Sequence, residues 1–375
     1  MPVITIEAPS VPDAAPRACA ARVAVVRTRP ETVLTDYARV MDLAGYRDTL
    51  SRDRDTLLKL NLSWTKYFPA CSSQPWQVDG VVGKMLADGF SRECLIPIEN
   101  KTVVTNPREG CRNNRWERVL ERHGLTFTPL TEVEWQLFTF KSPLLKLNDI
   151  FPEGIQIPSM YQGRQILHLP TVKTHGHAVM TGSVKNSFGG LLREVRHYAH
   201  KHMHEVLVDL LYMQRELHPA VFTVMDGTVA GDGAGPRTMI PRVKNLILAA
   251  TDSVAIDAIA ARLMGFDPLS IPFLRMAHER GLGIADPRQI ELVGDDVSRE
   301  NFGFQTKKSL VIWGDQMIRK GFLRPLERIL LHSPLMVWAP FASNVYHDAV
   351  WYPTIGQSRI RDFMHTGWGQ LFKKY

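Results

Sequence analysis

The sequence is poor in the features that mark metal clusters, secretion and membrane spanning. Only four cysteines occur in 375 residues, and no two form a CxxC pair. Residues 1–30 lack the basic-then-apolar order of a signal peptide, and no run of about 18 apolar residues is present. We therefore expect free thiols in a reducing compartment and no cysteine-held iron–sulfur or zinc site. The simplest prediction is a cytoplasmic protein.

An excess of positive charge is missing from most of the chain. The net charge of +7 resides almost wholly in residues 307–375, which contain ten Lys or Arg and four Asp or Glu. The first 306 residues are nearly balanced, so nucleic acid is not predicted as a partner. The same C-terminal segment holds four of the eight tryptophans. We interpret it as an appendage that packs on the core, contacts a membrane surface as a peripheral protein, or forms a homodimer interface.

The chain does contain a regular alternation of strand-like and helix-like segments. Apolar runs such as 21–28 and 94–100 alternate with helical patterns such as 75–89 and 253–265. This order predicts an α/β fold with a doubly wound, mostly parallel sheet. The predicted parts are a flexible N-terminus (1–20), a first α/β lobe (21–131), an insertion or cap (132–163), a second α/β lobe (164–306) and the C-terminal segment (307–375).

Polar residues follow four of the predicted strands. They are Lys59 with Asn61, Lys173 with His175, Asp226, and Asp252 with Asp257. Ligands of open α/β sheets bind beyond the carboxyl ends of the strands, so we expect these side chains to converge on one cleft. Asp226 is placed to act as a general base or metal ligand, although an Asp before Gly also starts turns. Asp252 and Asp257 either line the cleft or stabilise the helix predicted at 253–265.

A glycine-rich run at 227–236 follows Asp226. It matches neither GxGxxG nor GxxxxGK[ST], so no dinucleotide or P-loop site is predicted. Its backbone at Gly231 and Gly233 either cradles an anion or forms a plain hairpin turn.

Histidines cluster just beyond the second polar loop. On a helix His197, His200 and His204 would share one face, a spacing that suits a divalent metal ion. The alternative is a pH-sensitive, partly exposed helix start, and no zinc-protease motif is present. A divalent metal is therefore an option, and no cofactor is predicted with certainty.

Several motifs in a fixed order resemble the family known as domain of unknown function 362. They are KLN (59–61), PACSSQPW (69–76), KTHGHAVMTGSVKN (173–186), MDGTVAGDGAGP (225–236) and TDSVAIDAIAARLMG (251–265). The resemblance, from about residue 59 to 283, implies an α/β domain whose signature loops line one pocket. The matched positions are Lys59, Asn61, Lys173, His175, Thr181, Gly182, Lys185, Asn186, Asp209, Asp226, Gly231, Gly233, Asp252 and Asp257. A looser similarity to the lactate racemase family is only an analogy.

These observations predict an enzyme that acts on a small anionic or carbonyl-bearing metabolite by acid/base chemistry. Isomerisation, elimination or cyclisation, as in a tailoring step of biosynthesis, fits better than hydride transfer. Lys59, Lys173 and Lys185 would bind negative charge, and His175 and Asp226 would move protons. The substrate-binding group would comprise Asn61, Thr181, Gly182, Asn186, Gly231, Gly233, Asp252 and Asp257. The alternative is a metal- or cofactor-binding redox accessory protein without its own turnover.

Overall fold

One large sheet organises the protein in the computed structural model, which describes residues 21–102, 105–193, 199–306 and 345–375. The strand order across the sheet is β12-β1-β11-β10-β7-β2-β3-β4. Its strands are β1 (Ala21–Arg27), β2 (Thr56–Lys59), β3 (Leu95–Glu99), β4 (Thr128–Pro129), β7 (Gln165–His168), β10 (Val221–Ala234), β11 (Thr238–Ala250) and β12 (Ile290–Gly294). Strand β8 (Thr171–His175) pairs with the far half of β10, and β9 (Val179–Thr181) pairs with β8.

The sheet is mostly parallel, which confirms the predicted α/β class. Strands β10, β7, β2, β3 and β4 run in parallel, and β1 runs parallel to β12. Strand β11 pairs antiparallel with both β1 and β10, and β9 pairs antiparallel with β8. The chain reaches β11 through a hairpin and not through a crossover helix, and a hairpin reverses the chain direction. This reversal decides where the residues after β11 lie.

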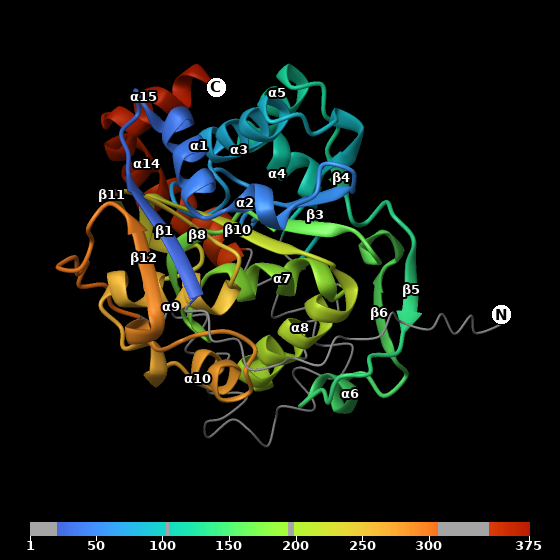
Figure 1. Ribbon diagram of the computed structural model, residues 1–375. Helices are drawn as coiled ribbons and strands as arrows, with labels where there is room; N and C mark the ends of the chain where they lie inside the picture. Colours follow the sequence, from blue (N-terminus) through green and yellow to red (C-terminus); the bar gives the residue numbers. More distant parts are fainter. Residues whose placement is uncertain (1–20, 103–104, 194–198, 307–344) are drawn as a thin grey trace.

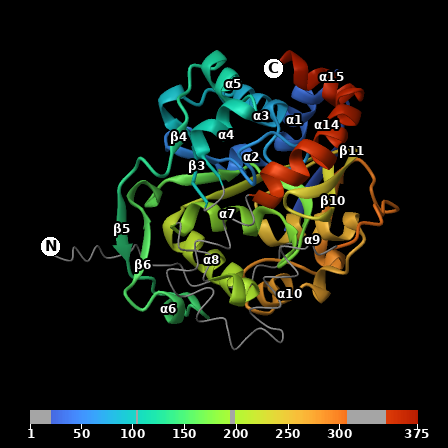
Figure 2. The same ribbon diagram turned by 180° about the vertical axis from the view of Figure 1, so that it is seen from behind.

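Helices cover both faces of the sheet (Figures 1 and 2). One face carries α1 (Val33–Leu43), α2 (Tyr46–Thr49), α3 (Pro75–Ala87), α4 (Pro107–Asn113) and α5 (Trp116–Arg122). The other face carries α7 (Ser183–Leu191), α8 (Met203–Leu217), α9 (Ser253–Met264) and α10 (Pro272–Glu279). Each face of the sheet buries its own apolar cluster against these helices. The buried runs in β1, β10 and β11 follow from this two-sided covering.

The predicted insertion at 132–163 contains a separate two-stranded sheet and a short helix. The sheet consists of β5 (Trp135–Phe138) and β6 (Ile155–Pro158), and the helix is α6 (Leu147–Ile150). Asp209 of α8 joins α6 to the core, because its carboxylate accepts the backbone N–H groups of residues 145, 146 and 147 at 2.5–2.9 Å. Asp209 thus has a structural role at the start of α6.

The C-terminal residues 345–375 pack on the face that carries α1 and α3. They form a π-helical segment (Val345–Gly356), α14 (Gln357–Met364) and α15 (Gly367–Lys374). Trp368 packs on Trp76 of α3 with ring centroids 5.1 Å apart, and its indole N–H donates to Asn245. A membrane contact is one of the alternatives for residues 307–375, and residues 307–344 of this segment lie outside the described residues. No helix in the described parts of the chain is long and apolar enough to cross a membrane.

Substitutions at two glycines of α3 test how closely α3 packs against α1. Both helices lie beside Asp226. A Cβ atom at Gly80 would lie 2.8 Å from Cβ of Tyr37 in α1, whereas a Cβ atom at Gly83 would meet only His123 at 3.6 Å. We expect Gly80→Ala to lower the free energy of unfolding by about 1–3 kcal/mol, since the close helix contact must open.

Gly83→Ala is the matched control and should leave stability unchanged or raise it by up to about 1 kcal/mol, because Ala is the better helix former. Urea unfolding of both variants measures the difference. Equal effects of the two substitutions would disprove the close-packing account.

Candidate functional site

A buried ion pair lies where β2 and β3 end. Lys59 Nζ donates to Glu99 Oε1 at 2.7 Å, and both side chains are almost fully buried. Glu99 also accepts the backbone N–H groups of Leu62 and Asn100 at 2.7 and 2.8 Å. The carboxylate therefore neutralises the lysine and holds the two chain segments that leave the sheet.

Lys173 lies next to this pair on β8 and has a different environment. Its ammonium group donates to Asn61 Oδ1, and to the Cys71 carbonyl and the Thr171 hydroxyl, both at 2.7 Å. These acceptors are neutral, and Lys173 forms no ion pair with any residue that the structure describes. Burial lowers the pKa of Lys173 from 10.5 to about 8, although Cys71 and Glu99 act in the opposite direction. The amine can therefore gain and lose a proton near neutral pH.

His175 follows Lys173 on the same face of β8, because alternate residues of a strand point the same way. Its Nδ1 accepts the backbone N–H groups of His177 and Ala178 at 3.1 and 3.3 Å. The ring proton is therefore assigned to Nε2. Burial holds the pKa of His175 well below 6.5, and the charge of Lys185 lowers it further. His175 is thus a neutral hydrogen-bond donor, and this geometry does not fit the prediction that it moves protons.

Two buried polar atoms near these residues have no hydrogen-bond partner among the described residues. They are the Thr181 hydroxyl and Asn186 Oδ1, on side chains that are only 3% and 2% exposed. Thr181 lies directly opposite Lys173 in the β8–β9 ladder. Asn186 donates from Nδ2 to the Lys59 carbonyl at 3.0 Å. Unpaired buried polar groups are costly, and a ligand or water is the usual partner.

Lys185 belongs to α7 and is half-buried. Its ammonium group lies 5.4 Å from the ring centroid of Phe188, within cation–π range. We call Lys59, Asn61, Glu99, Lys173, His175, Thr181, Lys185 and Asn186 the strand-end cluster. It contains three lysines and one carboxylate, so its positive charge exceeds its negative charge.

Asp226 does not belong to the strand-end cluster, which corrects the prediction that it works with His175. Its carboxylate accepts Tyr37 Oη at 2.6 Å and Trp76 Nε1 at 3.1 Å, from α1 and α3. These helices cover one face of the sheet, whereas α7 covers the other (Figure 1). Burial raises the pKa of Asp226 to about 6, opposed by the hydrogen bonds from Tyr37 and Thr228. Asp226 is a buried, fully bonded residue of the core.

Asp252 and Asp257 hold helices in place, so their predicted substrate-binding role is not supported. Asp252 caps α9 through the N–H groups of Val254 and Ala255. Asp257 accepts the N–H groups of Ser183 and Val184 at 2.6 and 3.1 Å, at the start of α7. Burial raises the pKa of Asp257 to about 7. A negative charge at this position stabilises the N-terminus of α7.

Gly182 is required by the approach of Asp257. A Cβ atom at Gly182 would lie 2.1 Å from Asp257 Oδ1. Gly182 therefore serves the start of α7. The geometry does not support a direct part for it in substrate binding.

The glycine-rich run belongs to the β10–β11 hairpin, so of the two alternatives for Gly231 and Gly233 the structure favours the hairpin over the anion cradle. Strand β10 continues to Ala234 and pairs with β11 up to the Ala234–Thr238 pair. Gly231 has a packing role, since a Cβ atom there would lie 3.0 Å from Cβ of Lys173 and 2.3 Å from the sulfur of Met239.

The predicted histidine metal site lacks its geometric basis. Helix α8 begins at Met203, so His200 precedes it and does not share a helical face with His204. His200 packs against His177, with ring centroids 5.5 Å apart, and His204 stacks on Phe273. His197 lies outside the described residues. In the described ranges, no group of three or more His, Cys, Asp or Glu side chains converges as metal ligands would.

Sequence reasoning missed Glu99 and two of the three acceptors of Lys173, Cys71 and Thr171. Glu99 ends a predicted strand just as Lys59 does. Its position at a strand end was the signal by which it could have been predicted as a site residue. Cys71 contributes its carbonyl oxygen to Lys173, which no side-chain motif reveals. Burial raises the pKa of the Cys71 thiol to about 11, so Cys71 is not an activated nucleophile.

A hollow of about 360 Å³ opens at the carboxyl ends of β3 and β4. It is lined by Asn100, Lys101, Leu130, Thr131, Val133, Trp135 and Arg193. Asn100 links it to the strand-end cluster, because its backbone N–H donates to Glu99. One residue that lines this hollow is therefore in contact with the cluster.

These features define an α/β protein with buried lysines and a neutral histidine at the carboxyl ends of a mostly parallel sheet. Residues 56–262, more than half of the chain, match the family described as "Domain of unknown function (DUF362)", and the chain belongs to that family. It is 30% identical over 130 residues to the thylakoid-associated protein sll1697 of Synechocystis sp.. This match covers 34% of the chain and only 40% of that relative. No solved structure matches the chain.

The Lys59–Glu99 pair should be strongly coupled. We expect Glu99→Gln and Lys59→Met each to lower the free energy of unfolding by about 3–5 kcal/mol, because each leaves a buried group without its partner. The double variant should lose clearly less than the sum of the two. The exposed pair Arg22–Glu291 is the control, and Glu291→Gln should cost under about 1 kcal/mol. Additive losses in a urea-unfolding cycle would contradict the pairing.

Lys173 should make stability depend on alkaline pH. Between about pH 8 and 10.5 the unfolded chain binds a proton at Lys173 that the folded protein has released. The contribution of Lys173 to stability therefore rises over this range and is lost as the pH falls through about 8. Relative to Lys173→Met, the wild-type free energy of unfolding should rise by about 3 kcal/mol. The exposed Lys374→Met should keep the wild-type profile, and an unchanged profile in Lys173→Met would refute the assignment.

Proposed function

We propose that this protein is an enzyme that binds a small anionic, carbonyl-bearing metabolite and moves a proton at the carbon beside the carbonyl. Such a proton transfer begins many isomerisations, eliminations and cyclisations. The observation that carries the proposal is a buried lysine with a pKa of about 8, two residues from a histidine fixed as a neutral donor.

The charge of the strand-end cluster supports an anionic substrate. Glu99 is committed to Lys59, and Lys173 is surrounded by neutral oxygens. Lys185 adds a further cation near His175, as the lowered pKa of His175 indicates. A carboxylate or phosphate would offset this buried positive charge. The unpaired Thr181 hydroxyl, opposite Lys173, offers the ligand a hydrogen bond.

In this proposal Lys173 and His175 have complementary roles. The neutral amine of Lys173 takes the proton from the carbon, and the C–H electron pair moves to the carbonyl as an enolate forms. The Nε2–H group of His175 donates to the enolate oxygen and stabilises its charge without becoming positive. The proton is then returned to the substrate, so no external oxidant or reductant is needed.

Deuterium exchange tests the proposal without knowledge of the net reaction. The protein is incubated in D₂O with 2-oxo and 2-hydroxy carboxylates, carbonyl-bearing phosphates and a small-molecule cell extract. Mass spectrometry then follows solvent deuterium entering carbon. We expect exchange into at least one compound, with a rate that rises about tenfold per pH unit up to about pH 8 and then levels off, because only the neutral amine accepts a proton.

Matched variants separate the two roles. Lys173→Arg keeps the positive charge but cannot act as a base, so exchange should fall at least about a hundredfold while the fold is retained. His175→Gln keeps an N–H donor and should lose less activity than His175→Leu. Exposed Lys374→Met and His365→Gln are the controls. Full exchange activity in folded Lys173→Arg would rule out this mechanism.

A further inference from the structure

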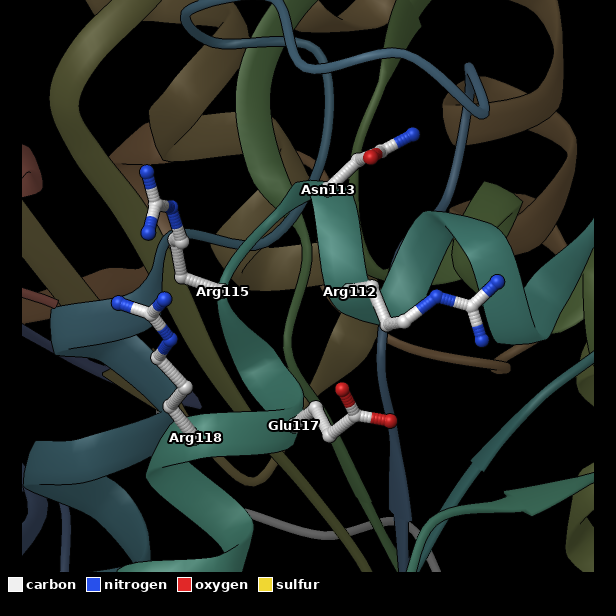
Figure 3. Close-up of a pocket in the computed structure, with 5 residues that line it drawn as sticks. All are labelled: Arg112, Asn113, Arg115, Glu117 and Arg118. Atoms are coloured by element: carbon white, nitrogen blue, oxygen red, sulfur yellow. The ribbon is translucent and has the colours of Figure 1, made fainter.

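Helices α4 and α5 lie in the helical layer that carries α1 and α3, on the other face of the sheet from α7, and a second hollow lies beside them. It has a volume of about 330 Å³ and occurs where α4 meets α5 (Figure 3). Its lining residues are Arg112, Asn113, Arg115, Glu117 and Arg118. Three of these five residues are arginines, and none of them belongs to the strand-end cluster.

Arg115 is held in a fixed position by its backbone and by an aromatic ring. Its φ of 64° is left-handed, a conformation that costs a non-glycine residue about 1 kcal/mol or more. The guanidinium group lies 5.6 Å from the ring centroid of Phe372, which in turn stacks on Tyr67. Stacking uses the face of a guanidinium group and leaves its N–H donors at the edge. The side chain of Arg115 is therefore pre-positioned to bind an acceptor.

Arg118 points to the same side of the hollow as Arg115, and Arg112 and Glu117 extend on the other side (Figure 3). Arg118 donates to the backbone carbonyl of Tyr375 at 3.3 Å, so both arginines contact the end of α15. Phosphate-binding sites commonly combine such oriented guanidinium groups.

The arginines of the hollow differ from their sequence neighbours. Arg108 is paired with Glu132, and Arg122 with Asp79. In contrast, the side chains of Arg112 and Arg115 form no ion pair with any described residue, including Glu117, and Arg118 donates to a main-chain oxygen of Tyr375. Three arginines and one glutamate line the hollow, which leaves a net local positive charge that an anion would neutralise.

We propose that this hollow binds the phosphate group of a small phosphorylated metabolite through Arg115 and Arg118. The planar guanidinium fork matches the oxygens of a phosphate group in two-point hydrogen bonds. The volume exceeds what a bare ion needs and lies at the lower end of the range for small-molecule sites. The site is separate from the strand-end cluster, and it does not depend on the proposed enzymatic function.

Isothermal titration of the full chain with ribose 5-phosphate, ribose and inorganic phosphate tests this proposal. Ribose 5-phosphate should bind saturably, ribose should not bind, and inorganic phosphate should bind more weakly than the sugar phosphate. Arg115→Gln and Arg118→Gln should each weaken ribose 5-phosphate binding about tenfold. Glu117→Gln should strengthen it, because it removes the negative charge that lines the hollow.

Two further variants distinguish binding from loss of structure. Arg115→Lys keeps the charge but loses the fork, so it should bind with intermediate affinity. Arg280→Gln removes an exposed arginine on α10's side of the sheet and should bind as the wild type does. Circular dichroism confirms that each variant is folded. Absence of saturable binding by ribose 5-phosphate, or undiminished binding to folded Arg115→Gln, would overturn the proposal. Equal affinity for inorganic phosphate would overturn its assignment to a metabolite.

Discussion

Two lysines are buried at one end of the sheet, and only one of them has a carboxylate. Water is removed from both ammonium groups, and burial of a charge is costly unless a partner replaces the water. Glu99 replaces it for Lys59 with an opposite charge. For Lys173 the chain supplies only neutral oxygens, from Asn61, Cys71 and Thr171. The loop between β2 and α3 must therefore fold back over β8, because it provides two of these three acceptors.

The two neighbouring lysines therefore have different roles, one structural and one suited to proton transfer. Lys59 is paired with the buried Glu99 carboxylate, so the two form a structural ion pair. Lys173, without a carboxylate, has the lowered pKa that proton transfer requires. The same burial keeps His175 neutral, and the two backbone donors at Nδ1 determine which nitrogen carries its proton. One end of the sheet thus holds an amine that can release a proton and an imidazole that cannot gain one.

The sequence predicted the edge of the sheet correctly for part of the site, because parallel strands place their ends together. Lys59, Asn61 and Lys173 lie close together as expected. The strand-end rule does not specify which side chains a polar residue will bond, and Asp226 is bonded to Tyr37 of α1 and Trp76 of α3. Asp252 was misplaced because β11 runs antiparallel, which carries its end to the opposite edge.

Other parts of the site depend on contacts that local patterns do not contain. The glycines after Asp226 are compatible with an anion cradle or a hairpin turn, and only the pairing of β10 with β11 shows that the strand extends through them to a hairpin. The partners of Lys173 include a backbone carbonyl 102 positions away, which no spacing rule reveals. The α/β class was predictable from the alternation of strands and helices, since that signal is local and repeated along the chain.

The contact between Gly182 and Asp257 has a consequence for the evolution of the family. The carboxylate of Asp257 occupies the space that any side chain at position 182 would need, and it also holds the first N–H groups of α7. Neither residue can change alone without loss of that helix start. The two positions, 75 residues apart in sequence, should therefore be inherited together, and a homologue that lacks one should start α7 in a different way.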